Sequence, residues 1–214
     1  MIIPKQKGFS FDALLHKYSF DGGTIMSNTE ALSLSGIVDY RFLPEAASFA
    51  ALKIGSDVAK ATELYDKGLP WKVDFDHVRP YVEAWRAFKT AYEFKPLLIE
   101  HPIFVADLGY ATSPDRYGDS AIGRIIVQMK TGAVAPWVGL QTAAEERAVE
   151  FLLAKNNKRQ EAINPNMLSS DRRIGLELKS NGSYKATRFT DTTDLKVFVA
   201  ALTVAKYKRR QLRT

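Results

Sequence analysis

An apolar run in the middle of the chain constrains the fold more than any other feature. Residues 122–132, IGRIIVQMKTG, are rich in Ile and Val and end at a Thr-Gly pair, which is typical of a buried strand. Residues 95–107 read as extended, and residues 108–119 are rich in turn-forming residues. Each segment is bounded by Gly, Pro or Asp, so the series predicts a meander of three β segments.

Helical patterns and a hairpin surround this meander. Residues 75–92 place apolar side chains at helical spacing, with Pro80 in the first turn, where proline is tolerated. The dipeptide Asn181-Gly182 predicts a two-residue turn within residues 172–189. Further helices are predicted over residues 43–68, 137–155 and 191–210. The first forty residues read as an irregular or partly helical opening. The order of elements predicts an α/β or α+β single domain over all 214 residues, with a sheet flanked by helices.

Composition excludes several classes of site and partner. The chain has no cysteine, which removes disulfides, thiolate metal sites and cysteine nucleophiles. No segment reaches the roughly 18 consecutive apolar residues that a membrane span needs, and the N-terminus lacks the pattern of a signal peptide. These observations predict a soluble protein of a reducing cytoplasm, with no membrane partner.

The distribution of charge suggests a partner. The net charge of +6 is compatible with binding to nucleic acid. Residues 206–214 contain five basic residues and no acid, and they read as a basic C-terminal tail. Residues 155–159 and the pair Arg172 and Arg173 add positive charge. A tail that only aids solubility is an equally simple explanation of the terminal run.

Polar residues interrupt the predicted meander where chemistry is possible. Glu100 breaks an apolar run, Asp115 follows a proline, and Lys130 ends a buried strand. If the strands pair antiparallel, these charged groups converge at one edge of the sheet, together with Gln128, which shares a face with Lys130. Carboxylates of this kind hold Mg²⁺ or Mn²⁺, and a nearby lysine stabilises a phosphoryl oxyanion, as hydrolysis of a phosphodiester requires. The alternative is a surface aspartate and a strand-end lysine without such a role.

Four segments together resemble the PD-(D/E)XK nuclease superfamily, in particular its RecB-type and phage exonuclease-like members. The resemblance covers most of the chain and rests on ALKIGSDVAKATELYDKG (51–68), GYATSPDRYG (109–118), IIVQMKTG (125–132) and PWVGLQTAAEERA (136–148). It implies a restriction-endonuclease-like fold, in which helices flank a central mixed sheet. It also implies DNA as the partner and Mg²⁺ or Mn²⁺ as the cofactor. The resemblance further implies a phage or prophage protein that acts with recombination or replication proteins in the cytoplasm of a bacterial host.

The resemblance assigns roles to individual residues. Asp115 matches the metal-binding aspartate, with Glu100 as a further metal ligand. Lys130 matches the catalytic lysine, which explains why a lysine ends a buried strand. Gln141 matches a glutamine that the following helix carries into the site. The residues expected to contact DNA are Arg116, Trp137, Lys155, Lys158, Arg159, Lys208, Arg209 and Arg210.

Three positions depart from the family pattern. Ala59 stands for a helix histidine, Gln128 for the second strand acid, and Glu145 for a helix tyrosine. In one reading the site still works, with Gln128 as a weak metal ligand or water-orienting group and Glu100 or Asp57 supplying charge. In the other reading the site is dead and the fold is kept for DNA binding.

These considerations favour a DNA-binding protein of the nuclease fold with weak or lost metal-dependent cleavage. The alternative is an active exo- or endonuclease that uses Asp115 with Gln128 and Lys130. A third hypothesis is a soluble protein whose basic tail merely aids solubility, for which DNA binding at low salt should be absent.

Overall fold

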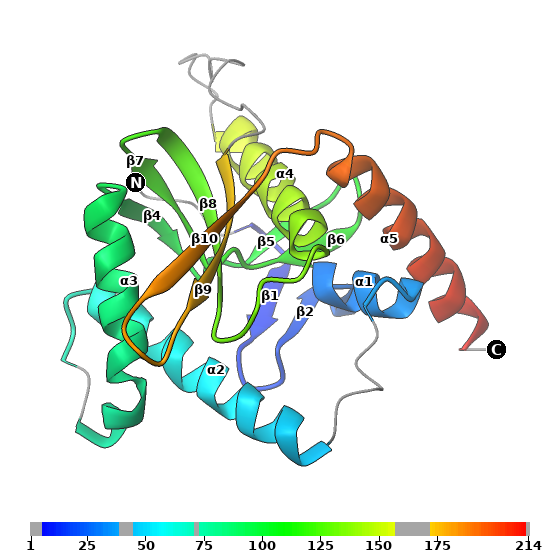
Figure 1. Cartoon of the computed structure of the whole chain (residues 1–214). Helices are drawn as coiled ribbons and strands as arrows, with labels where there is room; N and C mark the ends of the chain where they lie inside the picture. Colours follow the sequence, from blue (N-terminus) through cyan, green and yellow to red (C-terminus); the bar gives the residue numbers. More distant parts are fainter. Residues whose placement is uncertain (1–5, 39–44, 71–72, 157–171, 213–214) are drawn as a thin grey trace.

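A five-stranded mixed sheet forms the centre of the molecule, with helices on both faces (Figure 1). The structure is a computed structural model that describes residues 6–38, 45–70, 73–156 and 172–212. Its strands are β1 (Phe9–Asp12), β2 (Lys17–Phe20), β3 (Gly23–Ile25), β4 (Lys95–Ile99), β5 (Ile103–Val105), β6 (Tyr110–Thr112), β7 (Arg116–Ser120), β8 (Gly123–Lys130), β9 (Arg173–Leu178) and β10 (Tyr184–Phe189). Its helices are α1 (Asn28–Ser35), α2 (Glu45–Asp66), the 3-10 helix η1 (Val73–Val78), α3 (Arg79–Ala91), α4 (Val138–Asn156) and α5 (Asp194–Gln211).

The strands of the central sheet follow the order β10-β9-β8-β7-β4. β8 and β9 are parallel, and the other neighbouring pairs are antiparallel. α4 lies between the two parallel strands in the chain, as a crossover requires. β5 and β6 fall between β4 and β7 in the sequence but pair with each other in a separate sheet. The mixed sheet with flanking helices agrees with the architecture expected from the order of elements.

Alternation along β8 separates two apolar cores. Ile126 packs on one face of the sheet with residues of α1, α4 and α5. Ile125 and Val127 pack on the other face with residues of α2 and α3. Because side chains alternate with period two, Gln128 and Lys130 extend to the α4 side. The two polar residues at the end of β8 therefore share one face, as predicted.

The N-terminal segment differs from the predicted irregular or partly helical opening. β1, β2 and β3 form an antiparallel sheet of their own, and α1 follows it. The rings of Phe11 and Tyr18 stack across β1 and β2 at 4.6 Å, and Phe20 packs on Phe104 at 4.8 Å. These strands have three or four residues each, which is too short for their alternation to be recognised in the sequence.

Three other segments also differ from expectation. The extended run over 95–107 breaks at Glu100, whose φ of 47° turns the chain between β4 and β5. The turn-rich run over 108–119 contains β6 and β7, because its Gly and Pro residues bound short strands. The basic run that begins at residue 206 continues α5 as far as Gln211, so this part of it is helix and not a separate tail.

The remaining elements follow the sequence pattern. α2, α3, α4 and α5 occupy the four predicted helical segments, and Pro80 lies in the first turn of α3. β9 and β10 form the predicted hairpin. Its connection covers residues 179–183 and not two residues, with Gly182 at a φ of 80°.

A buried ion pair joins α2 to the start of β7. The side chains of Arg116 and Asp66 are fully buried, and Arg116 Nε donates to Asp66 Oδ2 at 2.7 Å. Arg116 also donates to Thr62 Oγ1 at 3.2 Å, and Lys89 Nζ donates to Asp66 Oδ1 at 2.7 Å. Each charge in this cluster therefore has an opposite charge beside it, which the interior requires. The cluster holds α2 and α3 against β7.

Removal of the Arg116 charge should destabilise the fold strongly. Arg116→Met keeps much of the side-chain volume but leaves the buried Asp66 carboxylate without its arginine. We expect the free energy of unfolding to fall by about 3–5 kcal/mol, as when one partner of a buried ion pair is removed. Urea unfolding followed by circular dichroism measures this change.

Arg124→Met is the matched control, because the ion pair of Arg124 with Asp119 is largely exposed. It should change the free energy of unfolding by less than about 1 kcal/mol. Equally small losses in the two variants would contradict a structural role for the Arg116 cluster.

Candidate active site

The pairing of β7 with β8 places Asp115 beside Gln128. Arg116 pairs with Val127, so the preceding residue lies next to Gln128 on the α4 side of the sheet. Asp115 Oδ2 accepts a hydrogen bond of 2.7 Å from the backbone N–H of Met129. Burial raises the pKa of the Asp115 carboxyl, while Lys130 and the Met129 N–H oppose the rise. The antiparallel register thus brings the acid to the Gln-x-Lys pair.

Glu100 lies beside Asp115 because the chain turns at the end of β4. Its backbone N–H donates to the Asp115 carbonyl oxygen at 3.2 Å, and Arg116 Nη1 lies 3.6 Å from its Oε1. Burial, and then the neighbouring Asp115, raise the pKa of Glu100 to about 8. The two carboxyl groups therefore oppose each other's ionisation, an effect that a bound cation would relieve.

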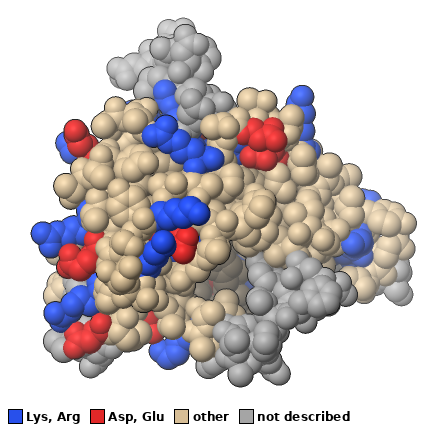
Figure 2. All heavy atoms as spheres, in the orientation of Figure 1, with Lys and Arg blue, Asp and Glu red and all other residues tan. Residues whose placement is uncertain are grey.

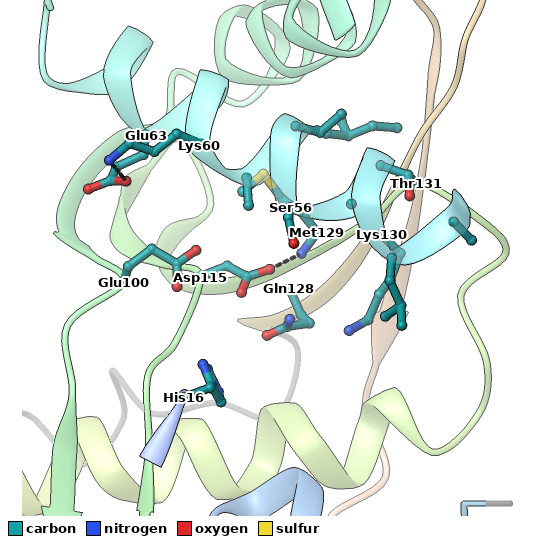
Figure 3. A pocket seen from close by; sticks show the side chains of 16 residues that line it. His16, Ser56, Lys60, Glu63, Glu100, Asp115, Gln128, Met129, Lys130 and Thr131 are labelled. Atoms are coloured by element: carbon teal, nitrogen blue, oxygen red, sulfur yellow. Dashed lines mark hydrogen bonds and ion pairs between the residues drawn. The ribbon is translucent and has the colours of Figure 1, made fainter. Parts of the chain in front are cut away.

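A cavity of about 910 Å³ collects these groups at the ends of the strands (Figure 3). The residues that line it include the whole predicted constellation, Glu100, Asp115, Gln128 and Lys130. Their predicted convergence is therefore confirmed. α2 forms a second wall, and His16 approaches from the turn between β1 and β2. In Figure 3 the Gln128 and Lys130 side chains point away from α2 and toward the yellow-green helix α4.

Lys130 connects the cavity to a chain of buried polar side chains on α4. Its Nζ donates to Gln141 Oε1 at 3.4 Å and lies 5.4 Å from the centre of the Trp137 ring. Gln141 Nε2 donates to Glu145 Oε1 at 3.0 Å, and Asn28 Nδ2 of α1 donates to the same oxygen at 3.4 Å. Because a carboxylate takes its NH₂ group, the Gln141 amide turns its oxygen toward Lys130.

Glu145 is part of this network, although the sequence pattern marked it only as a departure from the family. Its side chain is 0% exposed. Burial, followed by the charge of Asp115, raises the pKa of the Glu145 carboxyl well above its ordinary value. It lies four residues after Gln141, on the face of α4 that also buries Ala144 and Ala148. In the sequence, Glu145 is identified as an acidic residue at i, i+3 or i+4 spacing from apolar residues that face the core.

Gly175 of β9 allows the start of α4 to lie close to the site. It pairs with Gln128 in the parallel register of β8 and β9. A Cβ atom at this position would lie 2.5 Å from Val134 Cγ1, 2.9 Å from Phe189 Cε2 and 3.4 Å from Val138 Cγ1. The missing side chain thus makes room for the helix that carries Gln141.

Arg116 does not fit the predicted role of a DNA contact. Its side chain is 0% exposed and is held by Asp66, so the guanidinium is not available to a phosphate. Its Nη1 donates to the Asp115 carbonyl oxygen at 2.6 Å. The residue therefore positions the backbone of the candidate site from the interior.

Two basic residues near the end of α5, Lys208 and Arg209, contact α1 and not the cavity. Lys208 Nζ donates to the carbonyl oxygens of Leu34 and Ser35 at 3.0 and 3.3 Å. Arg209 Nη1 lies 3.8 Å from Glu30 Oε1. Neither side chain lines the cavity. Both serve the packing of α5 on α1, whatever else they bind.

The other residues predicted to contact DNA have varied positions. Arg210 is exposed near the end of α5. Trp137 is partly buried against the core on the α4 side, with Lys130 over its ring. Lys155 lies in the last turn of α4, and Lys158 and Arg159 lie outside the described residues. Their contact with DNA stays a prediction.

The position at which the resemblance expects a histidine also lies in the cavity. Ala59 lines it from α2, where the family resemblance places a histidine. Asp57, one expected source of extra charge, bonds to Lys53 at 2.9 Å and His77 at 3.0 Å and does not line the cavity. The structure therefore does not bring Asp57 to the site, whereas it brings Glu145 from α4 into the polar network of Lys130.

The available ligands for a metal ion are oxygen atoms of mixed type. Among the described residues, no group of three or more His, Cys, Asp or Glu side chains is arranged to hold a metal ion. Asp115 and Glu100 offer carboxylates, and Gln128 offers an amide oxygen that is buried without a hydrogen-bond partner in the described part of the chain. Hard cations such as Mg²⁺ and Mn²⁺ accept such a set, so these residues fit the implied ion.

Comparison with known proteins assigns no family to this chain. No family model matches it, and no curated protein matches it. The nuclease resemblance therefore depends on the sequence segments alone. As a separate finding, none of the helices in the described ranges has the length and apolarity that crossing a membrane requires.

A side chain at position 175 should displace α4 from the site. In Gly175→Ala the new methyl group overlaps Val134 and the Phe189 ring. We expect a loss of about 1–3 kcal/mol in the free energy of unfolding, as for other insertions into a packed core. Gly132→Ala is the control, because a Cβ there meets no atom within 4 Å. Urea unfolding compares the two, and a Gly175→Ala protein as stable as the control would contradict the close approach.

Proposed function

We propose that the chain is a DNA-binding protein of the PD-(D/E)XK nuclease type, with a restriction-endonuclease-like fold and weak or lost metal-dependent cleavage. The observation that carries the proposal is the neutral Gln128 beside Asp115, in a cavity that also holds Glu100 and Lys130, two other residues matched to the nuclease pattern. The mixed sheet flanked by helices is compatible with that fold. A phage or prophage origin, a bacterial cytoplasmic location and partners in recombination or replication are parts of the proposal that depend on the resemblance alone.

Three residues support a nuclease-type site. Asp115 lies where a metal-binding acid is expected, at the edge of the cavity and next to β8. Lys130 ends β8 and directs its ammonium toward α4, so it can approach a phosphate oxygen in the cavity and stabilise its charge. Gln141 holds that ammonium from the other side. The arrangement provides an acid, a cation and an amide within one network.

Two substitutions support weak or lost cleavage. Gln128 offers a neutral oxygen where a second carboxylate is expected, and a neutral oxygen binds Mg²⁺ more weakly. Its side chain also hydrogen-bonds Asp115 and lowers the pKa of that carboxyl. A bound cation would stabilise the ionised carboxylate in the same direction, so Gln128 partly replaces it. Ala59 offers no ligand at all. The site thus lacks both groups that would complete a strong metal centre.

If a divalent cation binds here, it supplies Lewis-acid activation of water and neutralises charge on the phosphate. Asp115 and Gln128 would hold the ion, with Glu100 at the neighbouring wall of the cavity. Lys130 would balance negative charge on the phosphate, and Gln141 would keep Lys130 in place.

Positive charge supports DNA as the partner. The chain carries a net charge of +6, and Lys60 and Lys130 line the cavity beside the acids Glu63, Glu100 and Asp115. Figure 2 shows Lys and Arg side chains spread over the face that carries β9 and β10, with Asp and Glu side chains among them. Contacts of this kind release counterions from the phosphate backbone, so binding should weaken steeply with salt.

One observation favours the alternative, an active Mg²⁺- or Mn²⁺-dependent exo- or endonuclease. Glu145 places a buried carboxyl in the network of Lys130 and Gln141, within electrostatic range of Asp115. This acid could compensate for Gln128. Cleavage with such a site would depend on Lys130 in the same way as in a complete nuclease.

A cleavage and binding assay tests the proposal. Purified protein is incubated at about 50 mM salt, where electrostatic binding is strong, with end-labelled single- and double-stranded DNA in EDTA, Mg²⁺ or Mn²⁺. We expect a mobility shift in EDTA and little or no cleavage in either metal. In Lys130→Ala any residual cleavage should disappear while the shift persists.

Lys185→Ala serves as the control, because this exposed lysine of β10 does not line the cavity. It should leave residual cleavage unchanged. Strong metal-dependent cleavage that Lys130→Ala abolishes would establish the alternative of an active nuclease. The absence of any shift at low salt would refute DNA binding altogether.

A further inference from the structure

Glu145 has an unusual environment for a carboxyl group. Its Oε1 accepts hydrogen bonds from two amide groups, those of Gln141 and Asn28. Its Oε2 is sealed from solvent and has no hydrogen-bond partner among the described residues. A buried acceptor without a partner costs about 1–3 kcal/mol, more if it is charged, so native proteins usually supply a water or an ion.

Gln128 of β8 resembles Glu145 in having a buried side-chain oxygen with an unmet hydrogen-bonding capacity among the described residues. Its side chain is 5% exposed, and within the described part of the chain its Oε1 also lacks a partner. Gln128 extends from β8 toward α4, the helix that carries Glu145. Gln128 hydrogen-bonds Asp115, and the Glu145 carboxyl interacts electrostatically with Asp115 and Lys130. One bound group could satisfy both.

The chemistry of the donors selects the kind of group. The two orphan atoms of this network, Gln128 Oε1 and Glu145 Oε2, are both oxygens. The charge of Asp115 also raises the pKa of the Glu145 carboxyl, so the two carboxyls oppose each other's ionisation. Lys130 carries a single positive charge and shares it with Gln141 and the Trp137 ring. A hard divalent cation would bind the unpaired oxygens and also balance the negative charge, because it accepts carboxylate and amide oxygens and neutralises two carboxylates. A water molecule would satisfy the orphan oxygens but not the charge.

We infer that Glu145 supplies the carboxylate that β8 lacks, and that a divalent cation binds among Asp115, Gln128 and Glu145 on the α4 side of the sheet. The inference rests on the metal site in the proposed function, but it requires no cleavage of DNA. One carboxylate ligand would then come from α4 and not from β8, at the position where the family resemblance expects a tyrosine. Glu145 is then a metal ligand, and Gln141 and Asn28 orient it.

Binding of Mn²⁺ to the full chain tests the inference directly. The probe is Mn²⁺ alone, with free Mn²⁺ followed by electron paramagnetic resonance and the heat of binding by calorimetry. We expect Glu145→Gln and Asp115→Asn each to weaken Mn²⁺ binding at least about tenfold, because each removes one charged ligand. Gln128→Leu, which removes the orphan amide oxygen, should weaken it as well.

Glu150→Gln is the matched control, since Glu150 lies on the same helix but its carboxyl interacts with Arg147, whereas that of Glu145 interacts with Asp115 and Lys130. It should bind Mn²⁺ as the parent protein does. Circular dichroism establishes that each variant is folded. If Glu145→Gln does not fold, Glu145→Asp decides, because it keeps the charge but withdraws the carboxylate by one carbon, and it must weaken Mn²⁺ binding under this inference.

The outcomes separate the inference from the proposed function. Loss in Asp115→Asn without loss in Glu145→Gln would overturn the inference and leave a metal site at Asp115. Absence of Mn²⁺ binding by the parent protein at about 10 mM would also overturn it, since a site with two carboxylates binds more tightly than that. A mobility shift with DNA would then still support the proposed function. Mn²⁺ binding that depends on Glu145, without any DNA binding, would uphold the inference and refute the proposed function.

Discussion

The buried guanidinium of Arg116 ties the candidate site to the rest of the fold. It pairs with Asp66 of α2, donates to Thr62 of the same helix and donates to the carbonyl oxygen of Asp115. One side chain therefore sets the distance between α2 and the start of β7 and the path of the backbone at Asp115. Because the pair is out of water, a change in either partner carries a large energetic penalty. The backbone position of Asp115 therefore depends on a side chain that does not itself line the cavity.

Two helices complete the site from opposite sides of the sheet. α2 contributes a wall that includes Ala59, which has no polar atom to offer. α4 contributes Gln141, which bonds to Lys130, and Glu145, which bonds to Gln141. Gly175 lets this helix start close to β9. The polar partners of Lys130 therefore come from α4, whereas α2 lines the cavity with Ser56, Lys60 and Glu63.

Much of this arrangement follows from local sequence. The period of two along β8 predicts that Gln128 and Lys130 share a face, and the spacing of apolar residues predicts α3. The role of Arg116 does not follow, because its partner Asp66 lies 50 positions away and nothing local distinguishes a buried arginine from an exposed one. The bond between Asn28 and Glu145 joins residues 117 positions apart. The short strands of the N-terminal sheet are stabilised by aromatic pairs such as Phe11 and Tyr18, which only the folded register brings together.

The central claim is that the cavity is a nuclease-type metal site that lacks one strand acid and one helix histidine. The most direct measurement is the rate at which the double variant Gln128→Asp with Ala59→His cleaves end-labelled DNA in Mn²⁺, beside the parent protein. The account predicts a rate at least about tenfold higher in the double variant, equivalent to about 1.4 kcal/mol of the activation barrier. A double variant that is folded and binds DNA, yet cleaves no faster than the parent, would contradict it.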